Sequence, residues 1–266
     1  MNKFHPFTNS LVSVPSGTFI QQSDDTNDGL ATAAYENLRH TISAFKMGKY
    51  EVTYELWYKV YQWGVSHGYT FANFGREGYQ CTYSHTTEMA APTEGEWQYA
   101  ASYIDGSRWT PWNYASGDSA PADRSTTIGN YAWYYGNAEG EFHNVGTKAA
   151  NRLGIHDMSG NVAEWVWDPQ DVYPIPSATD FKDHSPLQED QPRFICGGSI
   201  AAGAGESCPL NRLQVGRRYS RSAHITAAGL RVARSARQHE RGSRYGEWIM
   251  NNCSGQNPLF LSGFCI

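Results

Sequence analysis

The sequence is most constrained between residues 153 and 168, which read LGIHDMSGNVAEWVWD. Large apolar side chains, among them Trp165 and Trp167, are interleaved there with the carboxylates of Asp157 and Glu164. The alternation of residue types from 162 to 167 predicts a short half-buried strand. The glycines that precede it allow tight backbone where a side chain would collide. The window therefore predicts a polar turn that leads into a strand, with both tryptophans buried.

This window resembles the "GLYDMSGNVWEW" signature of the formylglycine-generating-enzyme type of C-type lectin fold. Other segments resemble further motifs of that family and occur in the family's order, at residues 12–19, 47–53, 92–101, 197–199 and 229–233. The resemblance implies an α+β fold with much irregular structure. The chain departs from the family pattern after residue 78, where the usual block containing a second helix is replaced by a direct run into Pro92.

The secondary structure around these motifs can be predicted from local patterns. Thr93 and Glu96 form an S/T-x-x-E capping box, which predicts a helix with Trp97, Ala100 and Ala101 facing inward. A second helix is predicted from Tyr54 to about Gly64, and its aromatic stripe is interpreted as core packing in preference to a ligand platform. Strands are expected at residues 11–20, 41–47, 193–198 and 229–233.

Length and composition are consistent with one sizeable domain. We expect residues 1–236 of the 266 to form it, and residues 237–266 to be a polar tail. The net charge of −5 excludes a globally basic nucleic-acid-binding protein. No apolar run is long enough to span a bilayer, and Met1–His5 lacks the apolar core of a signal peptide. If a leader precedes this sequence, the expected location is the cell surface or the extracellular space.

A calcium site is expected at the turn before the predicted strand. Calcium takes about 6–8 oxygen ligands, which combine carboxylates with backbone carbonyls. In the enzymes that this chain resembles, the matching positions bind calcium through the side chains of Asp157 and Glu164 and the backbone oxygens of Gly160 and Val162. The alternative is that the two carboxylates only form hydrogen bonds with the turn.

The cysteines predict that the chain has no catalytic residues. The enzymes in question bind copper with a C-x-x-x-x-C pair shortly after the Gly-Gly-Ser motif, because Cu(I) prefers thiolates. After Ser199 this chain has only Cys208 in that region, and Cys196 precedes the motif. Copper is therefore not expected as a cofactor. The five cysteines also form no C-x-x-C or zinc spacing.

The segment from residue 200 to 228 lies between two framework motifs and has no periodicity of its own. It resembles the C-terminal variable region of proteins diversified by retroelements, which use this same lectin-like fold. In those systems, mutation of template adenines cannot convert AAC or AAT codons to Lys, Met or Trp, and the segment contains none of these residues. The same mechanism cannot produce Glu or Gln, so Glu206 and Gln214 would have to be fixed positions. The alternative is an ordinary irregular loop of a catalytically dead homologue.

The resemblance implies a ligand-binding face that combines cationic and aromatic side chains. A protein or an acidic glycan on a host or neighbouring cell is the expected ligand, and nucleic acid is the second choice. Two other functions stay open: an oxidase related to the formylglycine-generating enzymes, and a purely structural scaffold. The residues expected in the face are Ile200, Ala201, Ala202, Ala204, Ser207, Arg217, Arg218, Tyr219, Arg221, His224 and Ile225.

Overall fold

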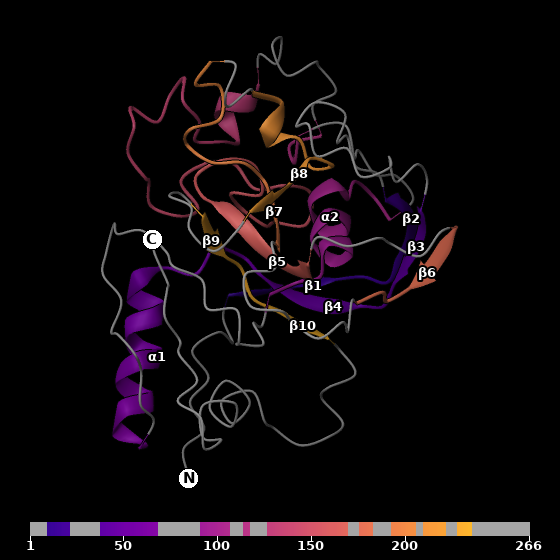
Figure 1. Cartoon of the computed structure of the whole chain (residues 1–266), viewed down its shortest axis with the longest axis horizontal. Coiled ribbons are helices and arrows are strands. Elements are labelled where there is room, and N and C mark those ends of the chain that lie inside the picture. The colour runs from indigo at the N-terminus through magenta and orange to yellow at the C-terminus, as the bar shows by residue number, and fades with distance from the viewer. Residues whose placement is uncertain are drawn as a thin grey trace.

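The structure is a computed structural model of the whole chain. It describes residues 10–21, 38–68, 91–106, 114–117, 127–169, 176–182, 193–205, 210–221 and 228–235. In these ranges the chain forms three small sheets, two α-helices and long irregular connections, which is the α+β class expected from the sequence (Figure 1). The predicted polar tail and the departure from the family pattern after residue 78 lie outside the described residues.

Two sheets form one side of the domain. The first has the order β1-β4-β10 and consists of β1 (Leu11–Val14), β4 (Phe45–Gly48) and β10 (Ala233–Ser235). The second has the order β2-β3-β6 and consists of β2 (Gly17–Gln21), β3 (Leu38–Ile42) and β6 (Ser177–Thr179). The single strands predicted at 11–20 and 41–47 are therefore each divided between two sheets. Pro15 lies at the first division, and proline has no N–H to donate to a sheet.

The third sheet contains the most constrained part of the sequence. Its order is β8-β7-β5-β9, from β8 (Arg218–Arg221), β7 (Arg193–Cys196), β5 (Ala163–Pro169) and β9 (Ala228–Leu230). The strand predicted at 193–198 ends at Cys196, because Gly197 and Gly198 turn the chain with φ of 86° and 66°. The strand predicted at 229–233 is instead two short strands, β9 and β10, separated by Arg231 and Val232.

Helix α2 (Glu94–Ser102) lies at the centre of the domain, where the sequence motif predicted it. The capping box is confirmed: the Glu96 N–H donates to Thr93 Oγ1 at 3.1 Å, and the Thr93 N–H donates to Glu96 Oε2 at 2.9 Å. Trp97, Ala100 and Ala101 are buried in the main hydrophobic core, as expected. Helix α2 contacts β2, β3, β5 and β7, so it joins two of the three sheets.

Helix α1 (Tyr54–Ser66) lies beside the body of the domain and apart from α2 (Figure 1). It ends two residues later than predicted, and Thr53 caps its start by accepting from the Leu56 N–H at 3.2 Å. Trp57 and Val60 are buried, which agrees with the interpretation of these positions as packing residues. None of the described helices is long and apolar enough to cross a membrane.

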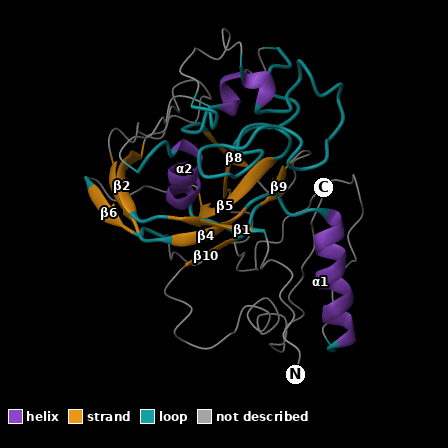
Figure 2. Cartoon of the chain, turned by 180° about the vertical axis from the view of Figure 1, so that it is seen from behind, coloured by secondary structure: helices purple, strands orange, loops and turns teal. Residues whose placement is uncertain are grey.

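Irregular chain dominates the end of the domain opposite β4 and β10 (Figure 2). The short 3-10 helices Ile128–Asn130 and Leu210–Leu213 lie in these connections. A second, smaller core holds them together and consists of Tyr114, Ile128, Ala132, Ala202 and Leu213, all of them at most 1% exposed. Ala202 and Leu213, both in the segment between 200 and 228, are thus anchored in a core that is separate from the main one.

Candidate functional site

The turn before β5 is held in a conformation that only a few residue types tolerate. Asp157, Gly160 and Asn161 all have positive φ, of 58°, 87° and 59°. A Cβ atom on Gly160 would lie 2.3 Å from the carbonyl oxygen of Trp133, so glycine is required at this position. The backbone of the turn is therefore packed directly against the backbone of the loop that begins at Trp133.

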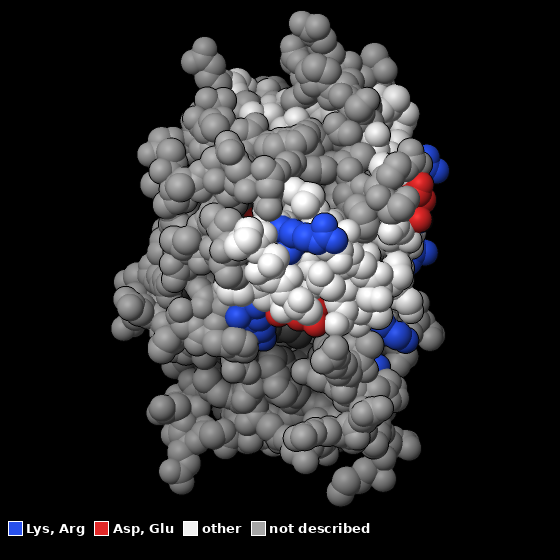
Figure 3. All heavy atoms as spheres, turned by 90° about the vertical axis from the view of Figure 1, so that its right-hand side faces the viewer, with Lys and Arg blue, Asp and Glu red and all other residues white. Residues whose placement is uncertain are grey.

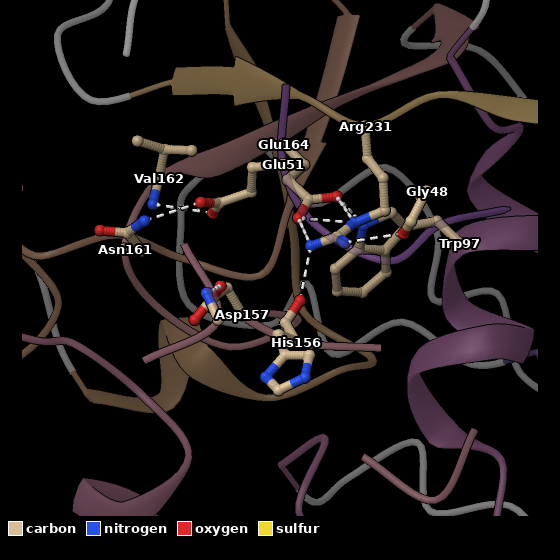
Figure 4. Close-up of polar contacts among 10 residues, drawn as sticks. Gly48, Glu51, Trp97, His156, Asp157, Asn161, Val162, Glu164 and Arg231 are labelled. Carbon is tan, nitrogen blue, oxygen red and sulfur yellow. Dashed lines mark hydrogen bonds and ion pairs between the residues drawn. The ribbon is translucent and has the colours of Figure 1, made fainter. Parts of the chain in front are cut away.

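A buried ion pair joins β5 to the C-terminal framework motif. The Arg231 guanidinium donates to both Glu164 oxygens, and the shortest of these contacts is 2.6 Å (Figure 4). Trp97 Nε1 of helix α2 donates to Glu164 Oε2 at 2.7 Å. Arg231 also donates to the carbonyl oxygens of Gly48 at 2.9 Å and His156 at 2.8 Å. This cluster connects four motifs that are far apart in the sequence.

A second carboxylate, Glu51, holds the other side of the turn. It accepts from Asn161 Nδ2 at 2.7 Å and from the Val162 N–H at 3.2 Å (Figure 4). Burial raises the pKa of Glu51 well above its ordinary value, and the nearby Glu164 and Asp157 carboxylates raise it further. For Arg231, burial lowers the pKa, but the Glu164 carboxylate, together with Glu51 and Asp157, raises it by more, so the net shift of the pKa is upward.

The calcium site expected from the sequence does not fit the side chain of Glu164. Both of its oxygens already accept hydrogen bonds, and the arginine beside them supplies the positive charge that a cation would supply. Asp157 Oδ2 accepts from the Gly146 N–H at 2.7 Å, while Oδ1 is buried without a hydrogen-bond partner. Among the described residues, no group of three or more His, Cys, Asp or Glu side chains is arranged to hold a metal ion. Calcium at Asp157, Gly160, Val162 and Glu164 stays a prediction, and the engagement of Glu164 by Arg231 counts against it.

The predicted variable segment starts and ends on the two sides of strand β5. Glu164 is paired in register with Cys196 of β7 on one side and with Gly229 of β9 on the other. The chain between these two residues leaves the sheet at Gly197, returns to it as the edge strand β8 beside β7, and enters it again as β9. Within it, the Ile200 N–H donates to the Asn161 carbonyl oxygen at 2.9 Å, and the Gly160 N–H donates to the Gly197 carbonyl oxygen at 2.8 Å.

The structure separates the predicted binding residues into three groups. Ile200, Ala201 and Ala204 are at least partly exposed. Ala202 and Arg217 are 0% and 1% exposed, so the expectation that both are displayed to solvent is wrong. Ala202 is part of the smaller core and Arg217 follows a tight turn closed by its own N–H, which donates to the Gln214 carbonyl oxygen. The third group consists of residues whose side chains or whole positions lie outside the description: Arg218, Tyr219 and Arg221 on β8, and Ser207, His224 and Ile225.

One cysteine, Cys196, lies within the described residues. It is 2% exposed and part of the main core on β7. Its register partner on β8 is Arg218. A buried thiol of this kind behaves as a small apolar side chain. Cys208 lies outside the described residues.

Two residues that are central to this site, Glu51 and Arg231, are not among the site residues predicted from the sequence. They lie inside the framework motifs at 47–53 and 229–233, which predict the fold but assign these two residues no function. For Arg231 a signal is present in the sequence: it is the one charged residue of the motif at 229–233, and a buried charge of this kind requires a partner of opposite sign. That partner is Glu164.

The architecture and this framework of interlocking motifs define a C-type lectin fold of the formylglycine-generating-enzyme type. A profile of the family described as "Sulfatase-modifying factor enzyme 1-like domain" matches residues 79–236, more than half of the chain. The chain belongs to this family.

Solved structures agree with the fold. Variable protein 1 of Treponema denticola is 21% identical with a TM-score of 0.58, and the match covers 84% of this chain and 94% of that one. CarF is 17% identical with a TM-score of 0.52, covering 85% of this chain and 97% of its own. PvdO from Pseudomonas aeruginosa is 21% identical with a TM-score of 0.52, covering 85% and 94%.

A curated relative shares a shorter stretch. The "Chaperone protein LppX" of Paenibacillus barcinonensis is 38% identical over 87 residues, which are 29% of this chain and 30% of that protein. The match therefore spans less than a third of the relative's length, and it bears on the shared domain alone.

Proposed function

We propose that this protein is a non-catalytic ligand-binding protein that displays a hypervariable segment, residues 200–228, on its lectin-type framework, and that a retroelement diversifies that segment. The observation that carries the proposal is the pairing of Glu164 with both Cys196 and Gly229. Because both ends of the segment lie beside one central strand, and its own strand β8 is at the edge of the sheet, changes outside β8 need not disturb the pairing of β7, β5 and β9. The similarity to Treponema denticola variable protein 1 supports the same function.

A variable face requires a framework that tolerates many sequences. Here the interactions that stabilise the framework come from residues outside the segment. They are the Glu164–Arg231 ion pair, the Glu51–Asn161 hydrogen bond and the core around Trp97. Ala201 and Ala204 are at least partly exposed in the described part of the segment, so positions of this kind can change side chain without entering a core. Ala202 and Arg217 belong functionally with the framework.

The expected partner is a protein or an acidic glycan on a host or neighbouring cell, which places the protein at the cell surface or outside the cell. Nucleic acid is less well supported. On the face shown in Figure 3, the charged side chains of the described residues form small separate groups of both signs, without a continuous basic patch. A protein that neutralises many phosphates needs such a patch.

The alternative is an oxidase homologue, since the family's description contains an enzyme. The absence of a C-x-x-x-x-C pair after Ser199 favours the non-catalytic function. We expect no copper-dependent conversion of a cysteine-containing peptide to formylglycine, measured by mass spectrometry. Turnover that is abolished by Cys208→Ser would establish the enzyme instead.

Diversification is tested by sequencing the gene across a growing population that carries the complete genetic locus. We expect substitutions concentrated in codons 200–228 at adenine-derived positions, with codons 202 and 217 less variable than those of exposed residues. A uniform scatter of substitutions along the gene would exclude the proposal. If codons 200–228 do not vary in the population although the protein is folded, the remaining alternative is that the protein is a purely structural scaffold.

A further inference from the structure

A loop outside the variable segment carries exposed aromatic side chains beside it. Of the large apolar side chains that are exposed in the described residues, Tyr135 is the most open at 61%, and Phe142 on the same loop is 39% exposed. The Tyr135 N–H donates to the Ala202 carbonyl oxygen at 3.0 Å. A Cβ atom on Gly203 would lie 3.8 Å from Tyr135 Cβ. The loop and the start of the segment therefore lie side by side.

The loop from Trp133 to His143 is closed at its base. The rings of Trp133 and His143 stack with centroids 3.6 Å apart, and His143 Nε2 lies 3.2 Å from the Ala138 carbonyl oxygen. The His143 N–H donates to Asn161 Oδ1 at 3.1 Å, which ties the loop to the turn before β5. Both exposed aromatic residues lie just inside this closure.

Hydrogen bonds inside the loop fix its shape. Asn137 Oδ1 accepts from the Tyr134 N–H at 2.9 Å, and Asn137 Nδ2 donates to the Ala132 carbonyl oxygen at 3.0 Å. The Glu141 N–H donates to the Ala138 carbonyl oxygen at 2.9 Å, closing a turn in which Glu139 has a φ of 54°. A non-glycine residue in this region is uncommon and must be held there by its surroundings. A loop that is ordered in advance loses less conformational entropy on binding.

The charge of the loop is one-sided. Glu139 and Glu141 are both exposed, and residues 131–146 contain no lysine or arginine. Exposed aromatic rings and carboxylates on one loop suit a basic side chain, because a cation is attracted both to a ring face and to carboxylate oxygens. An acidic glycan would meet repulsion at the same place. The charge of this part of the surface is thus opposite to the cationic surface expected from the variable segment.

We propose that residues 134–142 form a second, non-variable half of the binding face, and that this half binds a lysine or arginine side chain on the surface of a protein partner. The proposal rests on the proposed function, because it names the partner chemistry of the same face. In this arrangement the variable segment selects among partners, while Tyr135, Phe142 and the two glutamates supply a contact common to all of them.

The test uses the full chain against an array of random 12-residue peptides, with bound protein measured by fluorescence. We expect the bound peptides to be enriched in lysine and arginine beside apolar residues. Tyr135→Ala and the double variant Glu139→Gln, Glu141→Gln should each weaken binding by roughly 10-fold or more, as truncation of a central contact does. Tyr135→Phe should retain most of the binding because it keeps the ring. Tyr58→Ala, an exposed tyrosine on the distant helix α1, is the matched control and should bind like the parent.

The outcomes separate the two proposals. If Ala201→Arg or Ala204→Arg abolishes peptide binding while Tyr135→Ala does not, the variable face stands and its extension to this loop is wrong. No enrichment of basic residues, or no bound peptide, also overturns the extension. A parallel array of sulfated and sialylated glycans covers the other partner class. Binding there that is strengthened by the double glutamine variant would show that the face takes an acidic glycan and that the glutamates oppose it.

Discussion

Asn161 and Glu51 are 110 positions apart in the sequence, and the Asn161 amide donates to the Glu51 carboxylate at 2.7 Å in the interior of the domain. Through its other groups Asn161 also contacts the Trp133 carbonyl oxygen, the His143 backbone and the Ile200 N–H. One side chain and its peptide unit thus connect the framework, the aromatic loop and the start of the variable segment. Stability and binding should both depend on it.

Asn161→Ala should lower the free energy of unfolding by about 2–4 kcal/mol. It leaves the buried Glu51 without one donor and the His143 N–H without its acceptor, and each unsatisfied buried group costs about 1–3 kcal/mol. The measurement is urea denaturation followed by circular dichroism. Asn144→Ala, at an exposed asparagine directly after His143, is the control, and its free energy of unfolding should stay within about 0.5 kcal/mol of the parent's. Equal effects of the two changes would remove the structural role assigned to Asn161.

The ion pair between Glu164 and Arg231 gives a second prediction. Arg231→Met should destabilise the protein by about 3–5 kcal/mol, because it leaves a buried carboxylate without its counter-charge. The double variant Glu164→Leu, Arg231→Met should be less destabilised than this single variant, since both charges are then removed. Thermal melting of the parent, of both single variants (Arg231→Met and Glu164→Leu) and of the double variant at one pH checks both statements. A double variant that is as unstable as the sum of its parts would contradict the pairing.

The same cluster bears on the calcium prediction, which a melting experiment tests. Since Arg231 already neutralises Glu164, we expect EDTA to leave the melting temperature of the parent unchanged. A ligand that binds only the folded state raises its stability by mass action, so a calcium site would show itself as a fall with EDTA and a recovery with added calcium. That result, together with calcium found by metal analysis, would restore the site predicted from the sequence at Asp157 and Glu164. It would also require Arg231 to release Glu164.

Because Arg217 is buried, its replacement should lower the stability of the fold, whereas replacement of a solvent-exposed residue should not. Arg217→Ala should reduce stability by about 2 kcal/mol or more, because it removes a large side chain that is 1% exposed. Ala201→Ser, at an exposed position of the same segment, should change stability by no more than about 0.5 kcal/mol. Differential scanning fluorimetry distinguishes the two. If Arg217→Ala melts with the parent and only binding is lost, Arg217 reaches the ligand after all.

His40 predicts a loss of stability at acidic pH. Burial lowers its pKa to about 4, and the Asp180 carboxylate offsets this only in part. Its Nε2 accepts from the Phe181 N–H at 3.1 Å, which leaves the proton on Nδ1 beside Gln21 Oε1 at 2.7 Å. Because the unfolded chain binds the second proton near pH 6.5 and the folded chain only near pH 4, stability falls as pH drops between these values. The loss amounts to roughly 3 kcal/mol.

The variant His40→Gln isolates this contribution, since glutamine can replace both hydrogen bonds and does not titrate. Urea unfolding at several pH values between 7 and 4 should give a shallower decline for the variant than for the parent. Parallel declines would show that other groups, and not His40, cause the acid sensitivity.

Local patterns predicted the parts of the fold that local interactions determine. Thr93 and Glu96 interact within one helical turn, so their spacing alone was sufficient for the capping box. Trp165 and Trp167 were predicted to be buried from alternation along one strand, and they are 4% and 7% exposed. The family and the fold followed from several such motifs in a fixed order.

Long-range pairing was beyond the reach of these patterns. Glu164 and Arg231 are 67 positions apart, and nothing in either motif states which residue the buried charge contacts. Arg217 lies in a segment without periodicity, so its burial depends on a turn and a core that only the folded chain assembles. An arginine in such a segment suggested exposure, which is the common case for charged residues and was wrong for this one.

The placement of the variable segment across strand β5 has a consequence for engineering. Two strand spacings separate Cys196 from Gly229, a distance of about 10 Å, and between them the segment also contributes the edge strand β8 to the same sheet. Closing a flexible loop costs only about 0.6 kcal/mol more for each doubling of its length. The stretch between Gly198 and Arg217, which precedes β8, should therefore accept grafted loops of quite different sizes, provided that residues equivalent to Ala202 and Arg217 still fill the interior and β8 still pairs with β7. The domain would then be a scaffold on which ligand-binding loops can be exchanged.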